Sequence, residues 1–519
     1  MLRPQLEILS IIIMQQTIDT LDSLDFGSSV AEEETKNLQK YFVNTRFWRN
    51  LNNDKYDIVL GAKGSGKSAL YLNLISRHDE FADRGITIVE AENPLGDTVF
   101  ALLNNATRTE KYDNPNKEAL IQDDIIDFWK LYFLTIITSK LRATGFKGEN
   151  FKIIESLLES ANLLPKTFSL TDAFNNVLYF LRQVVSLQFF QPEVEVNPNT
   201  GTFTFKGKIS FEKYSAKEHK EGYNTLDELL EKLNTDLSKA NHTIWILLDR
   251  LDVAFINEKD LERRALKALF MVYNALKRYE QLRFKIFLRD DIMMKITYDG
   301  LREASHLTRM INLVIDESTL FNILIKRLLN NPVITDLYKI NVEECLLDIE
   351  QQKQLFKSVF PEKVEENGEV QDTFDWIVNR ISDGNGLFTP RELIHFLNQS
   401  KEQQIELLEL GNKPPEGKFF TQEALKRAIR EVSKAKYERT LIAENPDLID
   451  NFKKFRSAST KVSAEWMKAM LRDKDGKKIE DIDLFAIALS DIGFLKRVSE
   501  TQWEIPYIYQ YALGIVTED

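Results

Sequence analysis

The chain has 519 residues, of which 43% are hydrophobic and 29% charged, and its formal net charge is −12. These values are typical of a globular protein with several structural units, and the negative charge argues against wholesale coating of nucleic acid, although a local basic patch is compatible with it. The single cysteine, Cys345, excludes an intrachain disulfide framework and fits a reducing cytoplasm, and the five histidines show no spacing typical of a metal site.

An apolar run, Ile8–Met14, lies near the start of the sequence. It is far shorter than the roughly 20 residues that a membrane-spanning helix needs. No small-residue cleavage site follows it, so a signal peptide is not expected either. We predict no membrane segment anywhere in the chain, and Met14 is an alternative start of the natural protein.

The next pattern is a phosphate-binding loop. The apolar run Tyr56–Leu60 is suited to a buried strand, and Ala69–Ile75 continues as a helix. Between them, the sequence matches G-x-x-x-x-G-K-[ST] at every position: Gly61, Ala62, Lys63, Gly64, Ser65, Gly66, Lys67 and Ser68. Such a loop aims backbone N–H groups at a phosphate chain, while the lysine reaches the β- and γ-phosphates and the serine binds Mg²⁺. The strand–loop–helix order favours this interpretation over a chance glycine-rich turn, and predicts ATP and Mg²⁺ as cofactors.

A second strand is expected at Ile86–Ala91, and a mostly helical stretch follows it, including Ile121–Leu141. Two alternating runs around Asn197–Gly201 predict a β-hairpin. We interpret about 102–240 as an insertion in a nucleotide-binding core. Its hairpin could contact a partner or simply pack on the core, and the sequence favours neither.

Three further strands are expected at Ile244–Leu248, Phe284–Leu288 and Ile311–Ile315. Strands that alternate with helices predict an α/β fold with a parallel sheet and helices on both faces. The pattern from Phe321 to Asn412 is helical, and the polar "GNKPPEG" that follows predicts a linker. The rest predicts helices followed by a hairpin.

Asp249 ends the strand "IWILLD", where an aspartate of a P-loop protein holds Mg²⁺ and its waters; capping of the next helix is the alternative. In many related ATPases a glutamate follows this aspartate, but here Arg250 follows, which cannot act as a base. Asp252 is the nearest carboxylate and the candidate for orienting the attacking water, with an N-cap role nearly as well supported. Slow turnover is therefore expected.

Two arginines are candidates for sensing the γ-phosphate. Arg289 ends the strand "KIFLR", although Asp290 and Asp291 offer it a structural ion pair instead. In "TPRE", Thr389 as N-cap, Pro390 and Glu392 predict a helix start with a capping box. Arg391 would then lie in the first turn, where the helix dipole disfavours a cation, so a phosphate partner is favoured over a surface salt bridge.

The segments "DFGSSVAEEETKNLQKYFVNT", "GAKGSGKSAL", "LLDRLD", "KIFLRDDI" and "TPRELIHFLN" resemble, in this order, a bacterial P-loop ATPase family first defined from an uncharacterised cyanobacterial open reading frame. That family is similar to the STAND and origin-recognition branches of the AAA+ ATPases. The resemblance covers Asp25 to Ser400. It implies Walker A roles for Lys67 and Ser68, a Walker B role for Asp249, and sensor roles for Arg289 and Arg391.

The resemblance also implies an ATP-binding core, a helical lid and a C-terminal winged helix. The chain then divides into an N-terminal segment (1–40), a P-loop core (41–320), a lid (321–415) and a winged-helix-like domain (416–519). Because members of the family often occur in mobile or defence-associated loci, an antiviral role is implied by association only.

We expect a cytoplasmic ATPase that couples ATP binding or slow hydrolysis to self-assembly or to control of a protein partner. The alternatives are a DNA-acting ATPase and a nucleotide-gated scaffold without catalysis. The helix before the expected wing, Asp481–Ile492, is acidic and lacks Lys and Arg, so we do not expect it to bind DNA. Basic residues elsewhere in this domain, such as Lys453 and Lys477, leave another nucleic-acid surface open.

Overall fold

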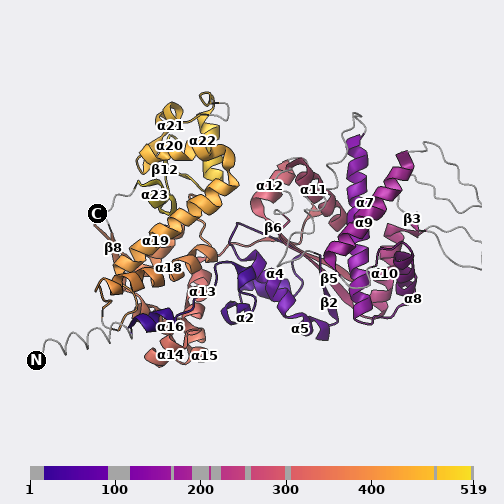
Figure 1. Cartoon of the computed structure of the whole chain (residues 1–519), viewed down its shortest axis with the longest axis horizontal. Coiled ribbons are helices and arrows are strands. Elements are labelled where there is room, and N and C mark those ends of the chain that lie inside the picture. The colour runs from indigo at the N-terminus through magenta and orange to yellow at the C-terminus, as the bar shows by residue number, and fades with distance from the viewer. Residues whose placement is uncertain are drawn as a thin grey trace, which may run out of the picture. The chain divides into compact units, whose positions relative to one another are not determined.

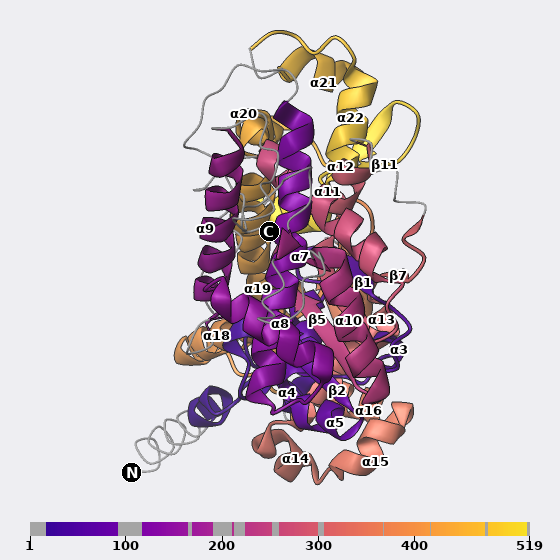
Figure 2. The ribbon, with the colours of Figure 1, turned by 90° about the vertical axis from the view of Figure 1, so that its right-hand side faces the viewer.

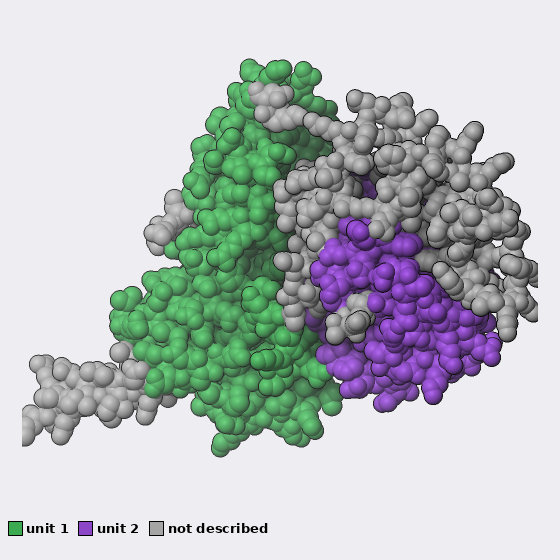
Figure 3. All heavy atoms as spheres, turned by 45° about the vertical axis from the view of Figure 1, so that its right-hand side comes forward, with its two compact units in different colours: residues 1–45, 63–66, 314–519 green, residues 46–62, 67–313 purple. Residues whose placement is uncertain are grey.

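The computed structural model describes residues 17–91, 117–164, 169–189, 210–211, 224–251, 259–298, 306–366, 368–415, 417–472 and 476–515. The chain forms two compact units, which Figure 3 colours separately. Unit 1 comprises residues 1–45, 63–66 and 314–519, and unit 2 comprises residues 46–62 and 67–313. Three sequence predictions lie outside the described residues: the apolar run Ile8–Met14, the hairpin around Asn197–Gly201, and Asp252.

Unit 2 is built on a five-stranded parallel sheet with strand order β2-β5-β6-β1-β7. The strands are β1 (Ile58–Gly61), β2 (Ile86–Glu90), β5 (Thr243–Leu248), β6 (Leu282–Arg289) and β7 (Met310–Asn312). All five predicted strands are present, and the predicted α/β class with a parallel sheet is confirmed. The prediction for β7 extended too far, because the chain leaves the sheet after Asn312.

Helices cover both faces of this sheet, because alternate strand residues point to opposite sides. On one face, Ile246 and Ile286 join an extensive apolar core with residues of α7, α10 and α11. On the other face, the Trp245 ring meets the Phe81 ring of α5 at a centroid distance of 5.0 Å. Figure 1 shows the long helices α7 and α9 beside the sheet.

Among the described residues of unit 2, the helices are α3 (Arg46–Asn52), α4 (Lys67–Ser76), α5 (His78–Asp83), α7 (Lys117–Ala143), α8 (Glu149–Ser160), α9 (Leu170–Phe189), α10 (Leu226–Lys239), α11 (Lys259–Leu276) and α12 (Asp290–Tyr298). Helix α7 confirms the predicted helix at Ile121–Leu141. A two-residue pair, β3 (Ser210–Phe211) with β4 (Asn224–Thr225), precedes α10. Thr225 and Glu228 form a capping box at the start of α10, which fixes where that helix begins.

Unit 1 is mainly helical. Its first part contains η1 (Ala31–Glu33), α2 (Leu38–Tyr41), α13 (Glu317–Leu329), α14 (Pro332–Tyr338), α15 (Val342–Leu347), α16 (Ile349–Val359), α17 (Thr373–Ile381), α18 (Pro390–Glu409) and α19 (Gln422–Lys436). A buried ion pair attaches the N-terminal segment to α13: Arg327 nitrogens donate to both carboxylate oxygens of Glu34, at 2.6 and 2.9 Å. Such a bidentate pair fixes geometry as well as contributing energy.

One sequence prediction in unit 1 is wrong. The chain from Phe321 to Asn412 is not helical throughout, because β8 (Lys363–Glu366) and β9 (Glu369–Asp372) form an antiparallel hairpin within it. In the sequence, Asn367 and Gly368 stand between the two strands, and Gly368, the described one of the pair, has a φ of +77°. Asn-Gly is the strongest short signal for a two-residue hairpin turn, and it could have identified this hairpin from sequence.

The end of unit 1 contains η4 (Tyr437–Ile442), η5 (Pro446–Leu448), α20 (Ile449–Lys454), η6 (Phe455–Ser457), α21 (Ala464–Met470), α22 (Ile482–Asp491) and α23 (Tyr507–Leu513). Strands β10 (Lys461–Ser463), β11 (Lys496–Arg497) and β12 (Gln502–Glu504) form an antiparallel sheet in the order β10-β12-β11. The predicted helices and hairpin of this region are present, and β10 was not predicted. No helix within the described ranges is long and apolar enough to cross a membrane.

Candidate nucleotide-binding site

The segment from Gly61 to Ser68 turns from the end of β1 into the start of α4. Gly64 and Gly66 have φ angles of +85° and +102°, values that side-chain-bearing residues rarely adopt. A Cβ on Gly66 would meet no described atom within 4 Å. The backbone conformation of the turn, not lack of space, therefore requires glycine at position 66.

Lys67 folds back over this turn. Its Nζ donates to the carbonyl oxygens of Gly61 at 2.7 Å and Ala62 at 2.9 Å. Lys67 also begins α4, a ten-residue helix whose N-terminus carries positive dipole charge. The Ser65 hydroxyl is buried and has no hydrogen-bond partner within the described part of the chain. An ammonium group, a helix N-terminus and a buried polar atom without a partner together fit a bound phosphate chain.

Four loop residues, 63–66, belong to unit 1. Within that unit, the Lys63 ammonium lies 2.9 Å from a carboxylate oxygen of Glu444. A Cβ on Gly64 would lie 2.8 Å from the Thr389 hydroxyl and 3.0 Å from the Arg391 Cβ. Gly64 is therefore next to the start of α18, and a side chain at position 64 would displace Thr389 or Arg391.

In unit 2, the parallel register brings strand ends to one edge of the sheet. Gly61 of β1 pairs with Arg289 of β6, and Leu248 of β5 pairs with Ile286 of β6. Asp249, the next residue after β5, is 5% exposed. The carboxyl ends of parallel strands are the usual ligand edge of such a sheet. Asp249, Arg289 and the start of the phosphate-binding loop therefore share the same edge.

Arg250, which follows Asp249, has a φ of +58°. This left-handed conformation is uncommon for a residue other than glycine, asparagine or aspartate, and such strain concentrates at functional sites. The sequence shows that Arg250 stands where many related ATPases have a glutamate, but it does not predict the backbone conformation of Arg250. Asp252, the candidate for orienting water, lies outside the described residues.

Ser68 and Asp249 are the protein groups suited to hold Mg²⁺. In the part of the chain that the structure describes, no group of three or more His, Cys, Asp or Glu side chains could hold a metal ion by itself. Mg²⁺ is usually held by one or two protein ligands together with substrate phosphates and water. Asp249 supplies an anionic oxygen and Ser68 a neutral one.

Arg289 makes the ion pair that the sequence offered as its alternative role. Its Nε and one terminal nitrogen donate to the two carboxylate oxygens of Asp291, at 2.9 and 3.1 Å. Burial raises the pKa of Asp291, but the hydrogen bonds and charge of Arg289 outweigh it and leave that pKa below its usual value. Asp291 therefore holds Arg289 at the sheet edge, and a sensor role stays a prediction.

Arg391 lies in the first turn of α18, as predicted, with Thr389 as N-cap and Pro390 at the first position. The predicted capping box is wrong. The Thr389 hydroxyl donates to the Glu392 carboxylate and caps no backbone group, while Glu392 also accepts from Lys436 of α19 at 2.9 Å. A buried carboxylate without a neighbouring cation is strongly destabilising, so the ion pair with Lys436 is favoured over a capping hydrogen bond. The Nε of Arg391 is buried and has no hydrogen-bond partner among the residues described.

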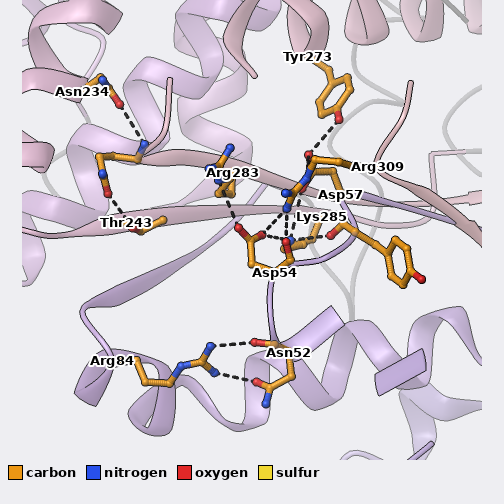
Figure 4. Close-up of polar contacts among 12 residues, drawn as sticks. Asn52, Asp54, Asp57, Arg84, Asn234, Thr243, Tyr273, Arg283, Lys285 and Arg309 are labelled. Carbon is orange, nitrogen blue, oxygen red and sulfur yellow. Dashed lines mark hydrogen bonds and ion pairs between the residues drawn. The ribbon is translucent and has the colours of Figure 1, made fainter. Parts of the chain in front are cut away.

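The opposite, amino-terminal edge of the sheet carries a charge cluster that was not predicted (Figure 4). The Lys285 side chain is fully buried, and its Nζ donates to Asp54 at 2.5 Å and to the Tyr56 carbonyl at 2.6 Å. Asp57 accepts from Arg309 and from the Tyr273 hydroxyl, each at 2.9 Å. Burial lowers the pKa of Lys285, against the opposing charges of the two aspartates. In the sequence, the lysine within the otherwise apolar run "FKIFL" could have indicated this cluster.

A hollow of about 480 Å³ adjoins this cluster, between the first residues of β2, β5 and β6. Its lining includes Asp54, Arg84, Glu280 and Arg283. Arg84 donates to the side chain and carbonyl of Asn52, each at 2.8 Å, and Arg283 pairs with Asp54 at 3.3 Å. Arg84, Arg283 and Asp54 thus have partners in the fold, and the hollow lies at the edge opposite the phosphate-binding loop. We interpret the cluster as structural.

Comparison with known proteins gives a distant likeness only. No protein-family model and no curated protein matches the chain. Six solved chains match, among them two structures of the Aeropyrum pernix ORC2 protein. The structure described as ADPNP-ADP complexes is 12% identical, with 91% of each chain covered and a TM-score of 0.38. The ADP form is 12% identical, with 92% of this chain and 96% of that chain covered, and a TM-score of 0.30. The fold assignment therefore depends on the strand order and the phosphate-binding loop of the chain itself.

Proposed function

We propose that the protein is an ATPase of the AAA+ kind, which couples ATP binding or slow hydrolysis to assembly or to control of a protein partner. The observation that carries this proposal is the turn at Gly61–Ser68, with Lys67 folded over its carbonyls at the sheet edge that also holds Asp249. Backbone N–H groups of the loop would bind the phosphates, and Lys67 would reach the β- and γ-phosphates.

Ser68 and Asp249 would hold Mg²⁺, which would neutralise part of the negative charge of the phosphates. The protein's own contribution is then positioning. Arg289, at the end of β6, is proposed to contact the γ-phosphate. Its guanidinium group must then either leave Asp291 or bind Asp291 and the phosphate together. Arg391, whose Nε is buried without a described partner, is proposed to report on nucleotide from α18.

The test of the nucleotide proposal is direct. Binding of a fluorescent ATP analogue to the full chain, with and without Mg²⁺, measures occupancy of the site. Phosphate release, with and without duplex DNA, then separates three functions. A rate of phosphate release that is the same with and without DNA supports control of a protein partner, and a rate increased by DNA supports a DNA-acting ATPase. Tight ATP binding without phosphate release supports a nucleotide-gated scaffold.

The biological setting of the proposal comes from sequence alone. The resemblance to a bacterial P-loop ATPase family with AAA+ and STAND affinities suggests a cytoplasmic protein in antiviral defence. The identity of the neighbouring genes tests this part, because a nuclease or toxin gene beside this one would name an effector. Neighbours that encode only replication proteins would favour the DNA-acting alternative.

The first prediction concerns the water-orienting residue. Asp252→Asn is expected to slow hydrolysis by about 100-fold, the usual contribution of a positioned acid–base group, while leaving ATP affinity within about twofold. Single-turnover hydrolysis and equilibrium ATP binding measure the two effects. The residue directly after Asp249 is Arg250, so no carboxylate at that position can take over the role. Equal hydrolysis by the variant and the parent would leave Asp252 a helix cap.

The second prediction concerns Arg391. Arg391→Ala is expected to remove the difference between the ATP-bound and ADP-bound protein in sedimentation or proteolysis, because the arginine would no longer contact the γ-phosphate. Arg427→Ala is the matched control, since Arg427 lies on α19 and pairs with Glu423 of the same helix at 2.7 Å. A wild-type nucleotide response in the Arg391 variant contradicts the sensor role.

A further inference from the structure

Helix α22 exposes an apolar face between carboxylates. Ala486 and Leu489 are buried on its inner side, whereas Leu484 and Ile487 are 64% and 44% exposed. Asp483 and Asp491 are exposed as well. Helical spacing places 483, 484, 487 and 491 on one side of the helix, and we call these four residues the acidic apolar face.

This face is unsuited to DNA. The stretch from Glu480 to Asp491 contains four acidic residues and no Lys or Arg. Phosphates would repel those carboxylates, and binding would release no counterions from them. Two large apolar side chains exposed side by side on a short helix instead favour a protein surface as the occupant.

The same region of the chain carries the complementary charge. From Ile449 to Ile479 the sequence has nine Lys or Arg residues against four Asp or Glu. Lys453, Arg456, Lys461 and Lys468 are all exposed, on α20, η6, β10 and α21. We call these four residues the basic segment. In Figure 2, α20 and α22 lie on different sides of this C-terminal group of elements.

We propose that the acidic apolar face of one copy of the chain binds the basic segment of a second copy. The charges are complementary, and the alkyl stems of lysine can cover Leu484 and Ile487 while their ammonium groups reach Asp483 and Asp491. Because α20 and α22 lie on different sides of this group of elements, we expect a head-to-tail contact, which builds a closed ring or an open filament. This deepens the assembly part of the proposed function and does not require a bound nucleotide.

The experiment uses the full chain in sedimentation velocity over a concentration series at low and high salt. The first variant is Asp483→Lys with Asp491→Lys, and Asp481 is kept because its side chain caps the Leu484 N–H at 2.9 Å. The second variant is Lys453→Glu with Arg456→Glu. Each is expected to weaken self-association at least tenfold, and an equimolar mixture of the two is expected to associate again, because every mixed contact can pair opposite charges.

Glu406→Lys with Glu409→Lys, exposed on α18, is the matched control and is expected to associate like the parent. ATP binding is measured for the parent and for every variant. A parent protein that does not bind ATP would disprove the proposed function and would leave this inference unchanged. The inference is overturned if the parent stays monomeric, if reversal on α22 leaves association unchanged, or if mixing restores nothing. Binding of a 20-base-pair duplex by monomeric protein, lost on Lys453→Glu with Arg456→Glu, would assign the basic segment to DNA instead.

Discussion

Replacement of Lys67 by alanine is expected to lower ATP turnover by at least about 100-fold, the usual cost of removing one electrostatic donor from a reacting group. The Lys67 ammonium group donates to the carbonyls of Gly61 and Ala62, and Lys67 is the first residue of α4. ATP affinity is expected to fall with turnover, since the lysine would contact the β- and γ-phosphates in the ground state as well. Phosphate release and fluorescent ATP binding measure the two losses.

Folding is expected to survive this change. Lys67 is only partly buried, and its hydrogen bonds to the Gly61 and Ala62 carbonyls contribute about 1 kcal/mol each. Lys63→Ala is the matched control in the same loop, because the Lys63 side chain pairs with Glu444 and only its backbone belongs to the proposed cradle. Its expected loss is below about tenfold. A folded Lys67 variant that hydrolyses ATP at the wild-type rate would show that this loop does not take part in the proposed ATPase activity.

The sequence was most informative where a short-range pattern has one structural solution. The run Tyr56–Leu60 followed by the complete phosphate-loop motif predicts strand, turn and helix, and all three are present. The runs that became β2, β5 and β6 are rich in Ile, Val, Leu and Phe, and their central residues are buried, as expected for parallel strands covered on both faces. The sheet edge that collects Asp249 and Arg289 then follows, because parallel strands end on the same side.

The sequence was least informative about which charge pairs with which. Glu392 fits a capping box by spacing, yet it pairs with Lys436, which lies 44 residues away. Lys285 and Asp57 are far apart in the chain and meet only because β6 lies beside β1. Such pairings are set by tertiary packing, and a pattern of local spacing cannot contain them. The hairpin at Lys363–Asp372 is a different case, because the Asn-Gly dipeptide between its strands is a local signal that the sequence contains.

The last prediction uses the buried pair between α18 and α19. Glu392 is 5% exposed, and Lys436 Nζ lies 2.9 Å from its carboxylate. Glu392→Gln is expected to destabilise unit 1 by about 3–5 kcal/mol, because the Lys436 cation remains buried without its counter-charge. The double variant Glu392→Gln with Lys436→Met is expected to recover most of that loss, since it leaves no buried charge. Urea unfolding measures all three proteins, with the exposed Glu402→Gln on α18 as a control expected within about 0.5 kcal/mol of the parent.

The pair also predicts a pH window for this stabilisation. Burial raises the pKa of Glu392, but the Lys436 charge and the Thr389 hydrogen bond outweigh it, and the net pKa is lowered. Burial likewise lowers the pKa of Lys436, but the charge of Glu392 outweighs this effect, so the net pKa of Lys436 is raised.

The contribution of the glutamate to stability is therefore present above its unfolded pKa of about 4.3 and is lost as the pH falls below that value. The lysine contribution is present below about 10.4, its unfolded pKa, and is lost as the pH rises through its folded pKa. The difference in unfolding free energy between the parent and the double variant should thus change mainly below about pH 5 and above about pH 10. Equal stability of the parent and Glu392→Gln at pH 7 would show that the pair does not hold the two helices together.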